Sequence, residues 1–161
     1  MTELKELDFS TLTFCKLRIP RLIPKHLIQD VKGRTFTEEQ FYDYQEKNID
    51  NPFNHLFALI DSMKKIHGFL WVEINLLDKS LFVNTFSVDK AYWGKGKAIE
   101  KVIKFLEELK KLRGAPAVFW MTTNPKFFEK KGFKRSKNVL MEYNSEKGDT
   151  WDNHAAAVTT K

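Results

Sequence analysis

Hydrophobic and polar positions alternate with a period of two through the middle of the chain. Between Ile66 and Ile74 one set of side chains comprises Phe69, Trp71 and Glu73, and the other comprises Leu70, Val72 and Ile74. This alternation is typical of a β-strand, in which successive side chains point to opposite faces. The apolar segments Leu56–Ile60 and Leu81–Val88 flank it, each joined to it by a short turn. The pattern predicts an antiparallel meander of three strands.

A helical period replaces the alternation further along the chain. Apolar residues recur at helical spacing up to Arg113, at Ala98, Val102, Phe105, Leu106, Leu109 and Leu112. Oppositely charged residues four positions apart, such as Glu100 and Lys104, support a helix on its polar side. Gly114 and Pro116 end it. The apolar segment Ala117–Met121 then returns as a buried strand, which predicts a β-α-β crossover.

Shorter elements are predicted before the meander. Thr13–Ile19 alternates as a strand and ends at Pro20, and Pro24–Val31 has a short helical pattern. Thr37 and Gln40 form a capping-box signature that opens a further helix. The aromatic residues of this region are Phe36, Phe41, Tyr42 and Tyr44. They either line a substrate cleft or pack the helix onto the sheet, and we favour packing.

Two elements are predicted after the crossover. Thr122 to Pro125 starts a short helix, because proline suits the first helical turn. The helix ends at Lys131, and Gly132 caps it. Asn138–Tyr143 is predicted to be the last strand.

The junction between Val88 and the long helix combines glycine with lysine. Gly94 and Gly96 lack a Cβ, so their backbone can approach a ligand closely. The first helical turn offers unpaired N–H groups and the positive end of the helix dipole, which favour a phosphate. The segment is therefore predicted to bind an anion. Its spacing is not that of the P-loop, and Ile99 stands where the Rossmann fingerprint requires glycine or alanine.

Composition narrows the class of protein. A chain of 161 residues with 42% hydrophobic and 30% charged residues is expected to fold as one globular domain. Its apolar runs are too short to span a bilayer, and its N-terminus lacks a secretory pattern, so we expect a cytoplasmic protein. The single Cys15 excludes an internal disulfide and a cysteine-based zinc site, and the four histidines show no metal-binding spacing. The net charge of +6 suits an anionic partner, although solubility alone explains it equally well.

Two motifs resemble those of the GCN5-related N-acetyltransferase (GNAT) superfamily. The run Trp93-Gly94-Lys95-Gly96-Lys97-Ala98, preceded by Ser87-Val88-Asp89, is similar to the acetyl-CoA loop Gln/Arg-x-x-Gly-x-Gly/Ala of that superfamily. Trp93 departs from it, since Gln or Arg is usual there. The run from Asn124 to Phe133 looks like the superfamily's Asn…Leu/Phe-Tyr-Glu-Lys-x-Gly-Phe segment.

The resemblance implies an α+β, mixed α/β architecture, the acyl-CoA N-acyltransferase fold. This fold has a central, mostly antiparallel sheet with helices on both faces. Residues 1–144 would form one GNAT-like domain, followed by a polar tail of residues 145–161. A protein partner would order that tail, or it would dock on the domain through Trp151.

The resemblance also implies where acetyl-CoA would bind as co-substrate. Its pyrophosphate would meet the N–H groups from Gly94 to Ala98, and its pantetheine arm would run between the strands Leu81–Val88 and Ala117–Met121. The cofactor-binding residues implied are Phe86, Val88, Trp93, Gly94, Lys95, Gly96, Lys97, Ala98, Asn124 and Phe128.

Catalysis by such a site requires a general base, because an amine arrives protonated. The candidate is Glu73, whose alternative interpretation is an ordinary exposed strand carboxylate, and Asn124 is the second catalytic candidate. Asn84 and Ser87 are weaker candidates. The tyrosine that many GNAT enzymes use to protonate the leaving thiolate falls at Phe128, which has no proton to give. Tyr143 and Tyr92 are candidate substitutes, although nothing in their spacing requires this role.

These observations leave two functions open. The first is an acyl-CoA-dependent N-acetyltransferase, a transferase that moves an acetyl group to an unidentified amine. The second is a GNAT-fold scaffold without catalysis, for which the acetyltransferase-like internal virion proteins of T7-like phages offer a similar Gly96-Lys97-Ala98 helix start; such a protein would be virion-associated. Nucleic-acid binding ranks third, because no recognition motif accompanies the basic cluster Lys126, Lys130, Lys131, Lys134, Arg135 and Lys137.

Overall fold

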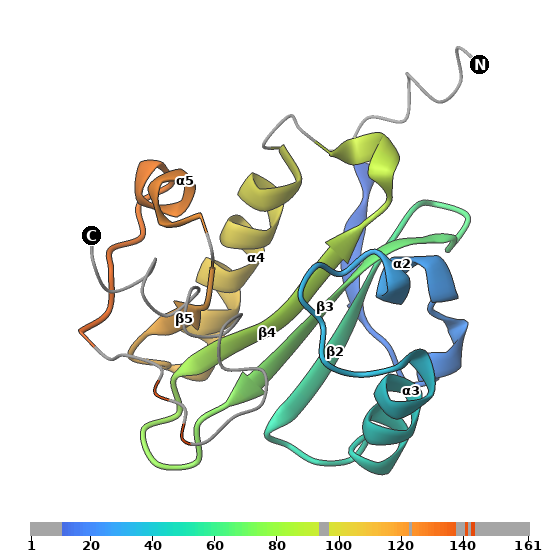
Figure 1. Ribbon diagram of the computed structural model, residues 1–161, viewed down its shortest axis with the longest axis horizontal. Coiled ribbons are helices and arrows are strands. Elements are labelled where there is room, and N and C mark those ends of the chain that lie inside the picture. Colours follow the sequence, from blue (N-terminus) through green and yellow to red (C-terminus); the bar gives the residue numbers. More distant parts are fainter. Residues whose placement is uncertain (1–10, 94–96, 123, 138–140, 142, 144–161) are drawn as a thin grey trace. The chain divides into compact units, whose positions relative to one another are not determined.

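A computed structural model of the chain describes residues 11–93, 97–122, 124–137, 141 and 143 (Figure 1). The chain divides into two compact units, Met1–Trp120 and Met121–Lys161, and each is described by itself. Among the described residues, no helix is long and apolar enough to cross a membrane.

The first unit is built on a five-stranded sheet whose spatial order is β1-β2-β3-β4-β5. The strands are β1 (Thr13–Lys16), β2 (Asn54–Ile60), β3 (Ile66–Ile74), β4 (Leu81–Val88) and β5 (Val118–Trp120). The first three pairs are antiparallel, and β4 pairs with β5 in parallel. The predicted meander and crossover are therefore confirmed. The first strand is shorter than predicted, because the 3-10 helix η2 (Pro20–Leu22) follows it.

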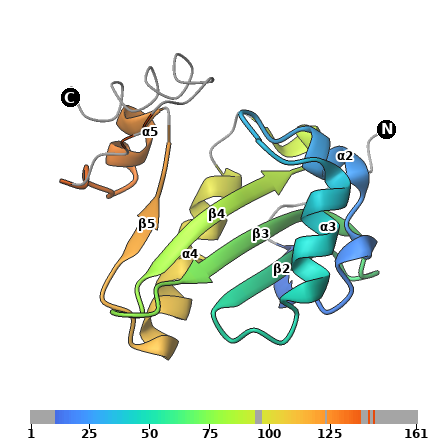
Figure 2. The same cartoon turned by 60° about the horizontal axis from the view of Figure 1, so that its bottom comes forward.

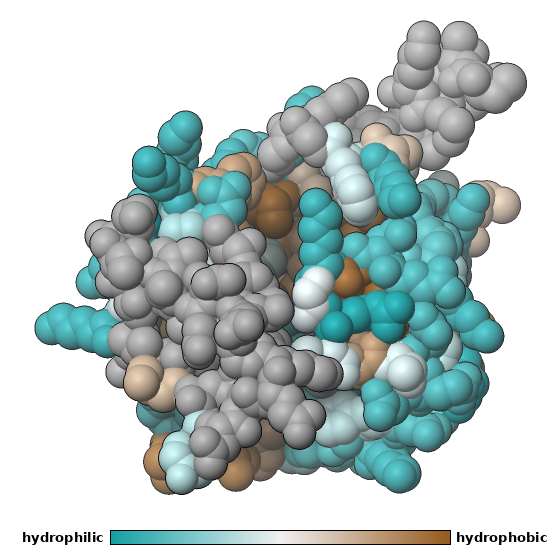
Figure 3. Space-filling view, in the orientation of Figure 1, coloured by the Kyte–Doolittle hydropathy of each residue, from teal (hydrophilic) through white to brown (hydrophobic). Residues whose placement is uncertain are grey.

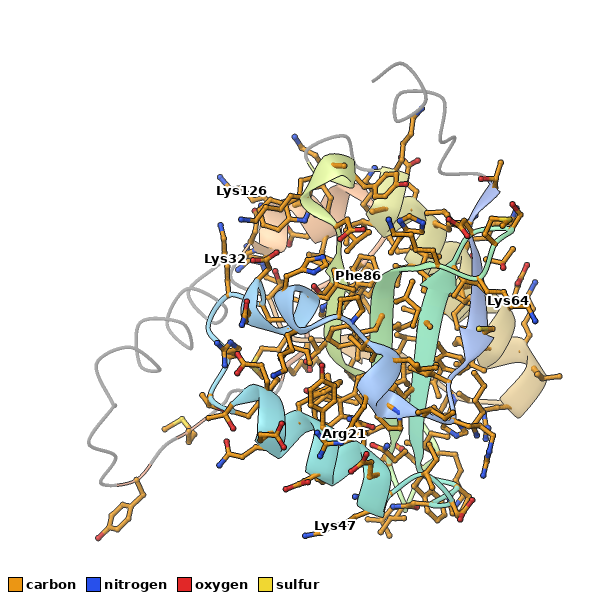
Figure 4. All side chains as sticks on the ribbon, turned by 90° about the vertical axis from the view of Figure 1, so that its right-hand side faces the viewer. Arg21, Lys32, Lys47, Lys64, Phe86 and Lys126 are labelled. Atoms are coloured by element: carbon orange, nitrogen blue, oxygen red, sulfur yellow. The ribbon has the colours of Figure 1, made fainter. Side chains whose placement is uncertain are left out.

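Two helices pack on one face of the sheet, α2 (Lys25–Gln29) and α3 (Glu38–Lys47). The predicted capping box opens α3: the Gln40 N–H donates to Thr37 Oγ1 at 3.1 Å, and the Thr37 N–H donates to Gln40 Oε1 at 2.9 Å. Phe41 and Tyr42 are buried against β2 and β3, so the prediction that they pack the helix onto the sheet is confirmed. Arg21 of η2 lies beside α3 and donates hydrogen bonds to Glu39, Asp43 and Glu46 (Figure 4).

The opposite face carries α4 (Lys97–Arg113). Its buried residues Val102, Leu106 and Leu109 form a second core with side chains from the sheet, among them Phe57, Leu70, Val72, Leu81 and Val83. The alternation predicted along β3 is confirmed, since Phe69 and Trp71 belong to the core under α3 and Leu70 and Val72 to the core under α4. The first unit thus has helices on both faces (Figure 1).

The second unit contains α5 (Pro125–Lys130). As predicted, Pro125 lies in its first turn and Gly132 follows it, with a positive φ of 101°. The predicted last strand, Asn138–Tyr143, and the predicted tail of residues 145–161 lie outside the described residues, apart from Met141 and Tyr143.

Gly68 lies at a close approach of β3 to the backbone of β4. A Cβ added at Gly68 on β3 would lie 2.6 Å from the Ser87 carbonyl oxygen and 3.2 Å from the Val88 Cα. These neighbours are backbone atoms of β4, which move only if the pairing of the two strands is disturbed. Gly68 therefore allows β3 and β4 to meet just where β4 ends.

We predict that Gly68→Ala lowers the free energy of unfolding by about 2 kcal/mol or more, as overpacking does. Urea denaturation followed by circular dichroism measures it. Ala91→Ser, which adds one atom at an exposed position, is the control. An unchanged midpoint for Gly68→Ala would contradict the close approach.

Candidate functional site

The outer edge of β4 is open along half of its length. Strand β5 pairs with β4 only from Leu81 to Val83, whose partners are Val118 to Trp120. All three residues of β5 take part in this pairing, which places β5 beside β4 at the edge of the sheet (Figure 2). Among the described residues, no strand covers β4 from Asn84 to Val88.

A β-bulge at Asn84 marks the point where the edge opens. Trp71 pairs with Thr85 and Val72 pairs with Val83, so Asn84 has no partner on β3. Such an extra residue bends its strand and redirects the groups that follow. The bulge and the end of the β4–β5 pairing therefore coincide.

The bulge sets which backbone groups reach the open edge. The Asp89 N–H donates to the His67 carbonyl at 2.8 Å, and Ser87, two residues earlier, pairs with Phe69. The backbone N–H and C=O groups of Ser87 and Asp89 therefore point toward β3. Because successive residues of a strand direct their N–H and C=O groups to opposite sides, those of Phe86 and Val88 point to the open edge. Figure 4 labels Phe86 on β4. Both residues are among those that the resemblance implies for binding of the cofactor.

Trp93 contacts this same edge. Its indole N–H donates to the Val88 carbonyl oxygen at 2.8 Å. One of the two acceptor positions of that oxygen is thus occupied, and one stays available. Lys90, in the 3-10 helix η3 (Lys90–Tyr92), lies 3.8 Å from Asp30 and 5.7 Å from the centre of the Trp93 indole. Helix η3 was not predicted; it lies between β4 and the glycine loop.

The predicted phosphate loop is described only at its borders. Gly94, Lys95 and Gly96 lie outside the described residues. Lys97 and Ala98 begin α4, as predicted, with Lys97 exposed and Ala98 buried against Val88 and other residues of a small core. The N–H groups of the first turn of α4 therefore follow the loop directly, which is the arrangement that favours a phosphate.

The candidate base Glu73 is half-buried and held at both oxygens. The Tyr44 hydroxyl donates to Oε2 and the Asn84 side-chain amide donates to Oε1, each at 2.9 Å. A carboxylate oxygen can accept two hydrogen bonds, and the described residues occupy one position on each oxygen of Glu73. Among the described residues, none forms an ion pair with Glu73. Glu73 is thus an oriented carboxylate with capacity for a cationic partner.

Tyr44 was predicted to pack its helix onto the sheet, with a place in a substrate cleft as the alternative. Its ring packs on Trp71, with centroids 5.4 Å apart, and it remains 40% exposed at the rim of α3. Burial and the hydrogen bond to Glu73 raise the pKa of Tyr44 above its usual value. The helical spacing in the sequence indicated only that Tyr44 lies near the sheet; nothing in it indicated a contact with Glu73.

Other polar residues of the first unit have structural contacts. The Ser87 hydroxyl donates to the Leu27 carbonyl oxygen at 2.6 Å, which occupies this weaker catalytic candidate. The buried His67 lies between Asp61 at 2.8 Å and Asp89 at 3.4 Å, and Asp89 also contacts His26 at 2.6 Å. The hydrogen bond from His67 lowers the pKa of Asp61. This chain of contacts fixes the end of β4 to β3 and α2. The described residues contain no group arranged to hold a metal ion.

Asn124 and Phe128 belong to the second unit. The exposed Asn124 caps α5, because its side-chain oxygen accepts the Phe127 N–H at 3.4 Å. Phe128 is buried, with ring centroids 5.5 Å from Phe127 and 5.4 Å from Phe133. It has the packing contacts of a core residue. Of the substitutes considered for its missing hydroxyl, Tyr143 is exposed, whereas Tyr92 packs edge-on against His67.

Comparison with solved structures identifies the fold. A possible acetyltransferase from Clostridium difficile 630 matches 84% of this chain over 98% of its own length, with a TM-score of 0.68 and 10% identity. Glucosamine-6-phosphate N-acetyltransferase from Arabidopsis thaliana matches 84% of this chain over 99% of its own, with a TM-score of 0.59 and 22% identity. AAC(6')-Iy, solved in complex with the bisubstrate analog CoA-S-monomethyl-acetylneamine, matches 83% of this chain over 98% of its own, with a TM-score of 0.64 and 12% identity.

The chain therefore has the acyl-CoA N-acyltransferase (GNAT) fold, as the two motifs predicted. No protein-family model matches the sequence, and no curated protein does so either.

We predict that Glu73→Gln lowers the pKa of Tyr44 toward its ordinary value, because a neutral amide no longer opposes ionisation of the phenol. The part of the shift that burial causes remains. NMR titration of tyrosines labelled at Cζ measures it. Tyr42, whose hydroxyl donates to the Ile23 carbonyl oxygen, serves as the internal control. An unchanged pKa of Tyr44 would contradict its hydrogen bond to Glu73.

Proposed function

We propose that this protein is an acyl-CoA-dependent N-acetyltransferase that moves an acetyl group from acetyl-CoA to an amine. One observation carries the proposal: the open edge of β4 ends at Asn84, and Asn84 holds the carboxylate of Glu73. A cofactor arm bound along this edge and a general base would thus meet at the same residue.

The residues along the edge fit the arm of acetyl-CoA. The outward backbone groups of Phe86 and Val88 offer hydrogen bonds of the kind that an amide-containing arm requires. The first turn of α4 and Lys97 favour the pyrophosphate, which Gly94 to Gly96 would approach with their backbone. Asn124 and Phe128 are proposed to border the arm, as the resemblance of their segment implies. The analog seen with AAC(6')-Iy contains CoA, which supports this choice of co-substrate.

The chemistry requires few protein groups. Bound acetyl-CoA supplies an activated thioester, so holding an amine against it gives much of the acceleration. Glu73 accepts a proton from the incoming ammonium group at one of its two open lone pairs. Tyr44 and Asn84 keep its carboxylate in one orientation. Asn124 is a further catalytic candidate.

A second candidate is a binding scaffold with this fold. It is favoured by Phe128, which is a buried hydrocarbon ring where GNAT enzymes carry tyrosine, and by the Trp93 indole on the Val88 carbonyl oxygen. In that case the polar tail of residues 145–161 is proposed to meet a protein partner. Binding of the cofactor decides between the two.

We predict that the wild-type chain binds acetyl-CoA in calorimetry and that Gly94→Asp/Gly96→Asp abolishes the binding, because each aspartate adds a Cβ and a negative charge to the loop. Met63→Asp/Leu77→Asp adds the same charge on exposed turns and is the control. Absence of binding by the folded wild type at millimolar acetyl-CoA would leave the scaffold as the function.

We predict that Glu73→Gln lowers kcat roughly 100-fold or more, as loss of a general base does, and leaves the affinity for acetyl-CoA unchanged. Release of free CoA thiol, followed with a panel of primary amines, measures the rate. Glu108→Gln removes an exposed carboxylate of α4 and is the control. A rate equal to that of the wild type would exclude Glu73 as the base.

A further inference from the structure

Two phenylalanines lie in line with Glu73 across the sheet. Glu73 on β3 pairs with Phe82 on β4, and Phe82 pairs with Phe119 on β5. Directly paired residues place their side chains on the same face. We call these three residues the Glu73–Phe82–Phe119 row. Because neighbouring strands are separated by about 4.8 Å, the row extends about 10 Å.

The row lies on the face opposite α4. Leu81 and Val83 belong to the core under α4, and Val118 and Trp120 pack against it. By alternation, Phe82 and Phe119 point to the other face, which carries α2 and α3. Figure 3 shows this side of the molecule, where the surface over α2 and α3 is mostly hydrophilic.

Neither ring is covered by the helices on that face. The core under α2 and α3 rests on residues of β2 and β3, such as Leu56 and Trp71. Phe82 and Phe119 are each 38% exposed, although Leu81 and Val83 beside them are buried. Two neighbouring exposed rings thus lie next to an oriented carboxylate.

The carboxylate adds a specific requirement for the ligand. Glu73 keeps one lone pair on each oxygen and has no ion-pair partner among the described residues. A primary ammonium group would satisfy it with two N–H donors. The nearby acids of α3 do not supply a second cation site, because Glu39, Asp43 and Glu46 already contact Arg21.

We propose that the Glu73–Phe82–Phe119 row is the acceptor subsite and that the acceptor is a primary amine with an aromatic or other apolar body. The ammonium group binds at Glu73, and the apolar body lies on the rings of Phe82 and Phe119. This inference rests on the proposed function, which makes the bound amine the acceptor of the acetyl group. The row also adjoins Asn84, where the open edge of β4 ends, so the amine is placed next to the reacting end of the cofactor arm.

Direct binding to the full chain, without acetyl-CoA, tests the subsite. The probes are 2-phenylethylamine, its neutral analog 2-phenylethanol, and spermidine, which has more charge and no ring. We expect 2-phenylethylamine to bind roughly tenfold more tightly than either of the others, since it alone satisfies both the carboxylate and the rings. Amide chemical shifts of the wild type should change around Glu73, Phe82 and Phe119.

Variants separate the two contacts. Glu73→Gln should remove the preference for 2-phenylethylamine over 2-phenylethanol. Phe82→Ala or Phe119→Ala should weaken the binding of 2-phenylethylamine roughly fivefold. Glu108→Gln and Leu77→Ala, at exposed positions elsewhere, are the matched controls. The shift map needs no variant, so it decides the location even if a phenylalanine variant unfolds.

The proposal is overturned if spermidine binds more tightly than 2-phenylethylamine, or if 2-phenylethylamine does not bind at millimolar concentration. It is also overturned if Glu73→Gln leaves the preference for the amine over the alcohol intact, or if the chemical-shift changes map to residues elsewhere. These outcomes are distinct from failure of the proposed function. Amine binding at the row without acetyl-CoA binding would support the subsite and exclude the transferase. Acetyl transfer only to polyamines would support the transferase and overturn the subsite.

Discussion

One extra residue in β4 is the constraint on which the rest of the site depends. A strand in the middle of a sheet uses its backbone groups on both neighbours, so it has none left for a ligand. At Asn84 the register of β4 on β3 shifts by one residue, just where the pairing with β5 stops. The groups of Phe86 and Val88 therefore face an edge that no described strand covers. The open edge is thus a product of the pairing geometry of β4 with its two neighbours.

The packing around β4 keeps this geometry in place. Buried side chains of α4 press on one face, and α2 contacts the other through the Ser87 hydroxyl and the Leu27 carbonyl. The absence of a Cβ at Gly68 lets β3 approach the last residues of β4. Beyond the strand, Asp89 is held by His67 and His26, and Trp93 returns to the Val88 carbonyl. The same contacts that order the end of β4 therefore bring Trp93, which precedes the predicted phosphate loop, to the open edge.

The bulge also connects the backbone to the candidate chemistry. Asn84 has no partner on β3, and its amide reaches the Glu73 carboxylate. Tyr44, from the helix above, holds the other oxygen. The Glu73 carboxylate accepts hydrogen bonds from two neutral groups and has no cationic partner among the described residues, so it can bind a cationic ligand. The exposed rings of Phe82 and Phe119 beside it favour a cation that carries an apolar group. Electrostatics and shape thus favour one class of ligand, an amine attached to an apolar body.

The sequence by itself determined the elements and their order. Alternation along β3, the helical period of α4, the capping box at Thr37 and Gln40, and the glycine–lysine motif are all local, because each depends on residues a few positions apart. They were sufficient to predict the fold. Glu73 was found as a candidate by its type and position in a strand. Only the tertiary structure decided the bulge at Asn84, the contact of Tyr44 with Glu73, the place of Trp93 at Val88, and the alignment of Glu73 with Phe82 and Phe119. Each of these depends on the register between strands or on the placement of a helix over the sheet, and register is set by the fit of whole faces rather than by the residues that come to lie side by side.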